Sequence, residues 1–174
     1  MNIHLKLTDA LYRDVTRDLG RPHPFALERI GFVLGRIGTH TDESTIIYLT
    51  KYHVIPDEHY IFDRAVGARI GPEAIVWATQ AAFHGRPLKE GIFHIHLHSH
   101  NGVTAMSATD AREIPKLLPG FRSVGREACH GIIILSLDHG SAWISLPDKT
   151  ELIAAKSINV IGAPIRIFEQ QVTT

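Results

Sequence analysis

The sequence predicts an α/β (α+β) fold in a single domain, residues 1–174, with a mixed, curved β-sheet flanked by about three helices. Strand-like and helix-like segments alternate along the chain, which favours helices packed on a mixed sheet. No repeat, low-complexity tract or long linker divides the sequence. A chain of 174 residues is long enough to bury a core of its own, so one domain suffices.

The first two elements follow from alternation and capping. Residues 2–7 alternate polar and apolar side chains, as a short strand with one buried face does. Thr8 is a typical N-cap residue, and apolar residues recur every four positions from Leu11 to Leu19, which predicts a helix. Gly20 and the prolines that follow it end this helix.

A strand pair comes next, at residues 30–37 and 44–55, joined by the polar turn 38–43. Beyond it, Gly71-Pro72 marks a helix start and Gly85 a helix end. The remaining expected elements are a helix at 73–84, a strand at 90–98, a helix from after Ser107 to about Leu118, a hairpin of strands 129–137 and 141–146 around 138–140, and an extended segment at 158–169.

Composition excludes several classes of partner. Eighteen basic residues balance eighteen acidic ones and form no basic stripe, which argues against nucleic acid as a partner. No apolar run has the length of a membrane span, and the N-terminus lacks a signal-peptide core. Cys129 is the single cysteine, so no internal disulfide is possible, and we expect a cytoplasmic protein. Because an apolar run follows Cys129, we interpret it as a buried strand residue rather than a fourth metal ligand.

The most informative stretch is residues 94–100, in which four histidines alternate with Ile95, Leu97 and Ser99. Residues two apart on a strand share one face, so the four imidazoles should form a column with about 6–7 Å between successive Cα atoms. Two neighbours in such a column can bind one metal ion when a third ligand comes from elsewhere. Imidazole and carboxylate ligands suit zinc, and three protein ligands leave the open position of a catalytic site.

Ser107-Ala-Thr-Asp110 has two interpretations. Ser-x-x-Asp before a helical pattern is typical of a capping box, in which the serine hydroxyl and the acidic side chain satisfy free amides. With the histidines just upstream, Asp110 is also the best candidate for the third metal ligand. Both roles can coexist, and Ser107 can also donate a hydrogen bond to a reacting oxygen.

Glu28 stands at the mouth of an apolar strand, in Glu28-Arg-Ile-Gly31-Phe-Val-Leu-Gly35. By itself such a residue is usually a solvated glutamate, and the two glycines allow a close approach to the backbone. Zinc-dependent hydrolysis requires a base that is not a ligand, to move a proton from water to the leaving amine. Glu28 is the candidate for this base.

Taken together, Glu28-x-x-Gly-x-x-Leu-Gly, His98-Ser-His100 and Ser107-x-x-Asp110 resemble the JAMM, or MPN-plus, metalloprotease motif. That motif occurs in deubiquitinating enzymes of the Mov34/PAD-1 type and in bacterial and archaeal relatives. The resemblance implies a JAMM/MPN-like domain in which His98, His100 and Asp110 hold Zn²⁺. It implies that Glu28 is the general base and that Ser107 stabilises the oxyanion.

The sequence departs from the motif in two ways. Asn101 stands where the family usually has proline, and six residues, 101–106, precede the serine where the family usually has seven. The shorter segment leaves the register open, because His96 and His98 could serve as the ligand pair instead. We prefer His98 and His100, since His-Ser-His-Asn-Gly matches the usual His-Ser-His-Pro-Gly with one change. The two upstream histidines, His94 and His96, are then expected to pack or to hydrogen-bond behind the ligands.

The implied function is that of a zinc isopeptidase or peptidase, which hydrolyses the amide bond after the C-terminus of a ubiquitin-like protein. The implied partners are that protein or its conjugates, with E1-like and E2-like proteins of bacterial operons, some of them in antiphage defence. Two alternatives stay open: a zinc-free MPN-type scaffold or dimerisation module, and a zinc amidohydrolase of small peptides or cysteine adducts.

Residues 56–70, with Tyr60, Phe62 and Arg64, form either a loop over the site or a plain connection that packs its aromatic side chains into the core. Neither substrate-binding residues nor an oligomeric state can be assigned.

Overall fold

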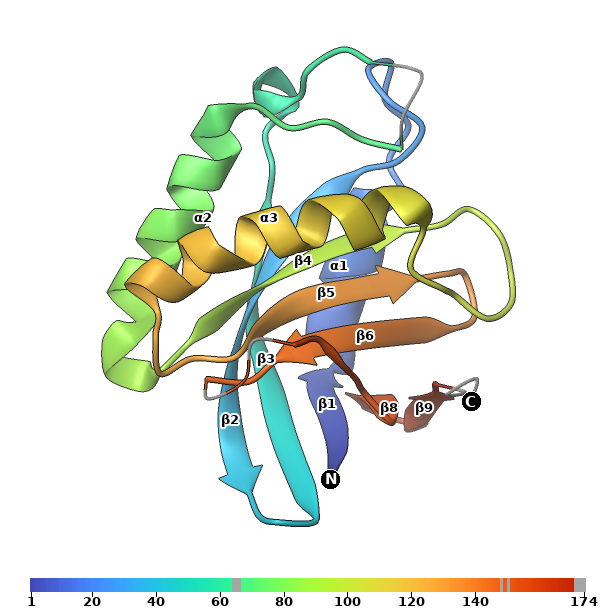
Figure 1. Cartoon of the computed structure of the whole chain (residues 1–174). Helices are drawn as coiled ribbons and strands as arrows, with labels where there is room; N and C mark the ends of the chain where they lie inside the picture. The colour runs from blue at the N-terminus through green and yellow to red at the C-terminus, as the bar shows by residue number, and fades with distance from the viewer. Residues whose placement is uncertain (64–66, 148, 150, 171–174) are drawn as a thin grey trace.

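The computed structural model describes residues 1–63, 67–147, 149 and 151–170. Within these residues one curled sheet runs in the order β7-β6-β5-β4-β2-β3-β1-β8-β9, with three α-helices beside it (Figure 1). The predicted mixed α/β class with about three helices is therefore confirmed. The elements are β1 (Asn2–Thr8), α1 (Asp9–Leu19), β2 (Ile30–His40), β3 (Ser44–Val54), η1 (Asp57–His59), α2 (Pro72–Gly85), η2 (Arg86–Leu88), β4 (Gly91–Leu97), α3 (Ala108–Val124), β5 (His130–Leu135), β6 (Gly140–Ser145), β7 (Ile153–Ala154), β8 (Ser157–Ile161) and β9 (Arg166–Glu169).

Most expected elements form within a few residues of their predicted bounds. The hydroxyl of Thr8 accepts a hydrogen bond from the Leu11 amide and caps α1, as its position indicates. The turn between β2 and β3 is shorter than predicted, because β2 continues to His40. The segment expected at 158–169 divides into two antiparallel strands, β8 and β9.

Helix α3 differs most from its prediction, since it continues past Leu118 to Val124 although Pro115 and Pro119 lie within it. Ile114, Leu118 and Phe121 are buried, and they recur at the spacing of one helix face. The packing of this face offsets the hydrogen bonds that the prolines remove, because buried apolar area outweighs local propensity.

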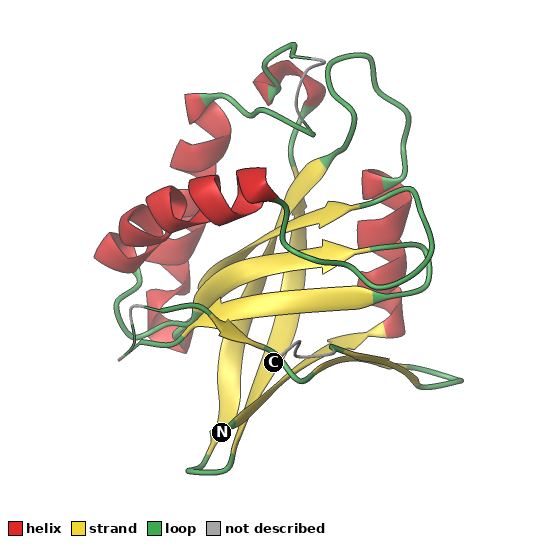
Figure 2. Ribbon diagram, turned by 45° about the vertical axis from the view of Figure 1, so that its right-hand side comes forward, coloured by secondary structure: helices red, strands yellow, loops and turns green. Residues whose placement is uncertain are grey.

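The helices cover the sheet from both sides. Figures 1 and 2 show α2 and α3 on one face and α1 on the other. Phe93 and Ile95 of β4 pack in the core that α1 completes, whereas Ile92 packs in the core that α2 completes. Alternate residues of a strand face opposite ways, so His94 and His96 lie on the face covered by α2 and α3.

Two further expectations concern Cys129 and the membrane. Cys129 is buried in the α1-side core, and burial raises the pKa of its thiol to about 12, which confirms a packing role for this side chain. Among the described residues, no helix combines the length and apolar character that a membrane crossing requires.

A Cβ atom added at Gly31 or Gly35, the two glycines after Glu28, would contact side chains rather than backbone. A Cβ at Gly31 would stand 2.3 Å from Cε2 of Tyr52, and one at Gly35 would stand 2.8 Å from the Phe93 ring. The Tyr52 hydroxyl donates to Asp18 on α1, which fixes the ring where it is.

Gly31→Ala should therefore lower the free energy of unfolding by about 1–3 kcal/mol, the usual cost of overpacking. Gly120→Ala is the matched control, because a Cβ there meets no atom within 4 Å and α3 should gain about 0.5–1 kcal/mol. Urea unfolding of both variants measures the two effects. Equal stability of the two variants would contradict the packing of Tyr52 on Gly31.

Candidate metal centre

The four histidines form the column that their alternation predicts. The ring centroids of His94 and His96 are 5.6 Å apart, those of His96 and His98 5.0 Å, and those of His98 and His100 5.2 Å. The first two rings stand on β4, and the other two stand on the segment that follows its end. One face of β4 and of the segment that follows it therefore presents a continuous row of imidazoles.

Two of these imidazoles converge. The Nε2 atoms of His96 and His98 are 3.2 Å apart, and Oε1 of Glu28 lies 3.6 Å from Nε2 of His98. Ligand atoms of these three residues lie within 4.8 Å of one another. On the other side, Oδ2 of Asp110 lies 3.9 Å from Nε2 of His96. Two imidazoles are thus flanked by two carboxylates.

This arrangement fits zinc. Tetrahedral bonds of about 2.0–2.1 Å place two nitrogen ligands about 3.3 Å apart, close to the observed 3.2 Å. An imidazole must also be neutral to bind a metal. Burial lowers the pKa of His96 to about 4, with His98 adding to this effect and Asp110 opposing it, so His96 is neutral at pH 7.

Of the three predicted ligands, His98, His100 and Asp110, only His98 belongs to the group whose ligand atoms lie within 4.8 Å of one another, and Glu28 and His96 are its other members. His98 belongs to it, but His100 is exposed, and its Nδ1 lies 2.9 Å from the carbonyl oxygen of Asn101. His96, expected behind the ligands, instead points its Nε2 at His98. The geometry favours the other register that the sequence leaves open, in which eight residues, 99–106, separate the second histidine from Ser107.

The pairing of β2 with β4 brings Glu28 to His98. These strands are antiparallel with Ile30 opposite His96, so the residue two before Ile30 meets the residue two after His96. The backbone N–H groups of Leu27 and Glu28 both donate to the carbonyl of Gly67, at 2.9 and 2.7 Å. The general position predicted for Glu28, at the mouth of a strand and beside the histidines, matches the structure.

Gly67 also lies directly over the Glu28 carboxylate. A Cβ at this position would stand 2.8 Å from Oε2 of Glu28, closer than real contacts allow. Residues 67–70 line the cavity at the site, as expected of a loop over it, whereas Tyr60 packs against the core that α2 completes, as expected of a plain connection. Arg64 lies outside the described residues.

A buried arginine next to Glu28 anchors the same segment. Arg29 is 1% exposed, and its Nη1 donates to Oδ1 of Asp57 at 2.8 Å. Its guanidinium lies 5.7 Å from the Phe25 ring and 5.9 Å from the Tyr60 ring. Sequence reasoning missed this anchor, because nothing in the pattern distinguishes a buried arginine from an exposed one.

The electrostatics of Glu28 suit proton transfer. Burial raises the pKa of its carboxyl, His98 and His100 oppose the rise, and Asp110 adds to it. A carboxyl with a raised pKa exchanges protons nearer to neutral pH than an ordinary glutamate does.

Ser107 and Asp110 form the predicted capping box at the start of α3. The Ser107 hydroxyl accepts from the Asp110 amide at 3.1 Å. In return, Oδ2 of Asp110 accepts from the backbone N–H of Ser107 at 3.1 Å and from its hydroxyl at 2.6 Å. The cap holds the carboxylate beside His96.

The segment 99–106, between the histidines and α3, is held against the β5–β6 turn. The backbone N–H of Gly102 donates to Oδ1 of Asp138 at 2.6 Å, and the Ser136 hydroxyl donates to the Gly102 carbonyl at 2.7 Å. The Thr104 hydroxyl donates to a main-chain carbonyl of β5 at 3.1 Å. These bonds fix where α3 begins, and hence where Asp110 lies.

A cavity of about 520 Å³ opens at the candidate metal centre. Its lining includes Glu28, His96, His98 and Asp110, together with apolar side chains from α2 and α3. The candidate ligands and base therefore line one shared cavity.

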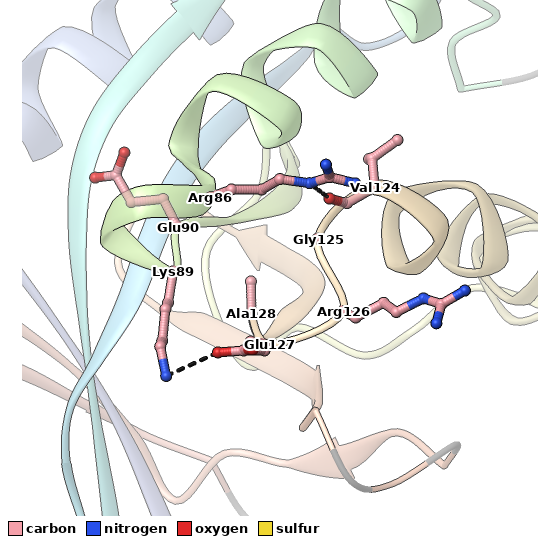
Figure 3. Close-up of a pocket in the computed structure, with 8 residues that line it drawn as sticks. All are labelled: Arg86, Lys89, Glu90, Val124, Gly125, Arg126, Glu127 and Ala128. Atoms are coloured by element: carbon pink, nitrogen blue, oxygen red, sulfur yellow. Dashed lines mark hydrogen bonds and ion pairs between the residues drawn. The ribbon is translucent and has the colours of Figure 1, made fainter.

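A second cavity, of about 240 Å³, lies at the opposite end of β4 (Figure 3). Lys89 forms an ion pair with Glu127 at 2.8 Å, and the Arg86 guanidinium donates to the Val124 carbonyl. Figure 3 shows Arg126 pointing away from that ion pair. Charges paired in this way offer no evident ligand site.

Comparisons with known proteins identify no family. No protein-family model matches the sequence, and no curated protein matches it. A solved structure of the STIL N-terminal domain from Trichoplax adhaerens is similar at 11% identity and a TM-score of 0.37, over 82% of this chain. The match covers 44% of that chain, so this protein spans less than half of its length. Similarity at this level supports no conclusion about fold or function.

The hydrogen bond from the Gly102 N–H lowers the pKa of the Asp138 carboxyl. The free energy of unfolding should therefore depend on pH through the titration of Asp138. A group whose pKa is lowered by folding stabilises the protein above its ordinary pKa of 3.8, and this contribution is lost as pH falls through the lowered value. Asp138→Asn should therefore melt below the wild type at neutral pH, and the difference in Tm should vanish in acid. Asp42→Asn, in the exposed β2–β3 turn, is the control. A Tm difference that stays constant with pH would contradict this role.

Proposed function

We propose that the protein is a zinc-dependent isopeptidase or peptidase, with His96, His98 and Asp110 as zinc ligands and Glu28 as the proton-transferring base. The observation that carries the proposal is the convergence of two imidazole nitrogens, 3.2 Å apart, with a carboxylate on each side. An open cavity at this point favours a catalytic over a purely structural centre.

The two carboxylates differ in ways that support separate roles. Asp110 is fixed by a capping box at a helix start, which suits a ligand that must hold one orientation. Glu28 comes from an irregular segment and has a raised pKa, which suits a group that accepts and releases a proton. A carboxylate oxygen of Glu28 also lies within 4.8 Å of the ligand nitrogens of His96 and His98. Zinc retention in variants must therefore distinguish Glu28 as a metal ligand from Glu28 as a base.

Zinc held by His96, His98 and Asp110 would supply Lewis acidity toward a substrate carbonyl and a water molecule. Glu28 takes a proton from the attacking water and returns it to the departing amine nitrogen. The water oxygen bonds to the carbonyl carbon, the carbon–nitrogen bond breaks, and a carboxylate and an amine are released. The Ser107 hydroxyl donates to Asp110 and so orients that carboxylate. Its role at the oxyanion, implied by the motif resemblance, stays a prediction.

The choice of substrate rests on the motif resemblance alone. We propose the C-terminus of a ubiquitin-like protein, cleaved from a conjugate or precursor, in a bacterial operon with E1-like and E2-like partners and a role in antiphage defence. A cytoplasmic location agrees with a single, buried cysteine. The scaffold alternative is less well supported, because the side chains needed for zinc binding and proton transfer converge on one cavity.

Zinc content tests the ligand set. The wild type should bind zinc stoichiometrically by elemental analysis, and His96→Ala, His98→Ala and Asp110→Ala should lose it, because two protein ligands hold zinc poorly. His100→Ala is the matched control and should retain the metal. Zinc lost from His100→Ala but kept by His96→Ala would instead establish His98 and His100 as the pair. A wild type that folds but binds no zinc would favour the scaffold.

Glu28→Gln should keep zinc and lose hydrolysis by about 10²–10⁴-fold, the usual effect of removing a general base. The assay incubates the zinc-loaded protein with ubiquitin-like fusion proteins and follows product release by mass. Glu113→Gln, on the rim of the same cavity, controls for loss of one negative charge. Loss of zinc from Glu28→Gln would make Glu28 a ligand, and unchanged turnover would remove it from the mechanism.

A further inference from the structure

Tyr60 contacts the segment that carries Glu28 at three residues. Its hydroxyl donates to the carbonyl of Ile30 at 2.8 Å and accepts from the N–H of the same residue at 2.9 Å. Its ring stacks on that of Phe25, with 5.0 Å between the centroids, and the Arg29 guanidinium lies 5.9 Å from it. One tyrosine thus contacts the chain on both sides of Glu28.

The two hydrogen bonds take the place of a strand neighbour for Ile30. Strand β2 pairs with β4 as far as Ile30, but its pairing with β3 stops one residue short, at Gly31 opposite Val54. In an antiparallel sheet the N–H and C=O of one residue point to the same neighbour. Those of Ile30 point past the end of β3, where the Tyr60 hydroxyl satisfies both because it can donate and accept.

The position of Ile30 links these bonds to the candidate metal centre. Ile30 lies opposite His96 in the pairing of β2 with β4, and it lines the same cavity as Glu28. Glu28 comes two residues before β2 begins, so the first residue of β2 determines where its segment leaves the sheet. Without the Tyr60 hydroxyl, a backbone N–H and C=O two residues from Glu28 would lose their partner.

The same tyrosine also anchors the residues that face the Glu28 carboxylate. Tyr60 forms an antiparallel β-bridge with Ile70. Gly67, three residues before Ile70, accepts a hydrogen bond from the Glu28 N–H at 2.7 Å and lies over the carboxylate. Tyr60 therefore restrains Glu28 both through its own segment and through the residues opposite it.

We propose that Tyr60 is a positioning residue, whose hydroxyl holds Glu28 beside His98 in the place that proton transfer requires. The catalytic part of this inference rests on the proposed amide hydrolysis. The structural part, the restraint of the Glu28 backbone by Tyr60, is independent of any reaction. A displacement of about 1 Å from a reactive geometry can cost about a hundredfold in rate, so a side chain that never touches substrate can still limit turnover.

Amide hydrogen exchange of the full-length protein, measured by NMR, tests the structural part. In Tyr60→Phe, exchange of the Glu28 N–H should accelerate about tenfold, the effect of losing one hydrogen bond that resists local opening. Tyr52→Phe is the matched control, because it also removes a hydroxyl that donates a hydrogen bond, to Asp18 of α1 on the other face of the sheet. This control should leave exchange at Glu28 unchanged.

Unchanged exchange at Glu28 in Tyr60→Phe would overturn the proposal, as would equal acceleration in Tyr52→Phe. A measurement on the wild type keeps the proposal testable if Tyr60→Phe does not fold. The Ile30 N–H, which donates to Tyr60, should be protected, and exchange there at the rate of a free amide would be decisive against the proposal.

Kinetics with the ubiquitin-like fusion proteins test the catalytic part. Zinc-loaded Tyr60→Phe should keep its zinc content and its KM but lose about ten- to a hundredfold in kcat, whereas Tyr52→Phe should match the wild type. An unchanged kcat in Tyr60→Phe would overturn the positioning role and keep the peptidase. Accelerated exchange at Glu28 in Tyr60→Phe, with no hydrolysis by the wild type, would end the peptidase proposal and keep the restraint of Glu28 by Tyr60.

Discussion

The antiparallel pairing of β2 with β4 is the constraint on which the candidate site depends. With Ile30 opposite His96, Glu28 meets His98 just beyond the paired region. A slip of one residue would turn the histidines toward the face that α1 covers, because side chains alternate along a strand. Phe93 and Ile95 oppose such a slip, since it would carry these buried apolar side chains to the opposite face. The core on one side of β4 thus determines the chemistry available on the other.

One carboxylate comes from an irregular segment and the other from the first turn of a helix, and each has its own anchor. Glu28 is held by the hydrogen bonds that its own N–H and the N–H of Leu27 donate to the Gly67 carbonyl, and by the burial of its neighbour Arg29. Asp110 is held by its capping box with Ser107 at the start of α3. Sites of this kind work only when the supporting groups remove the freedom of a loop, since small displacements weaken metal binding and catalysis. Placing a buried arginine costs desolvation, which its hydrogen bonds and aromatic neighbours offset.

The histidine column divides by depth into groups with different surroundings. Burial lowers the pKa of His94 to about 3 and that of His96 to about 4, so both rings are neutral at pH 7. His98 stands at the mouth of the cavity beside Glu28, and His100 lies in solvent. One alternating run therefore provides a buried imidazole, two converging nitrogens and an exposed ring. These differences arise from the helices above β4, since the four side chains are chemically identical.

The sequence by itself determined the element order, the single histidine column, the cap at Ser107 and the position of Glu28 at a strand mouth, because alternation, capping and turn chemistry are local. It left the ligand pair open between two registers, since residues two apart on a strand are equivalent until something faces them. Only the tertiary structure decided that His96 and not His100 converges with His98, that α3 continues through two prolines, and that Arg29 and His94 are buried. Each of these depends on packing between segments far apart in the chain, and no local pattern records such contacts.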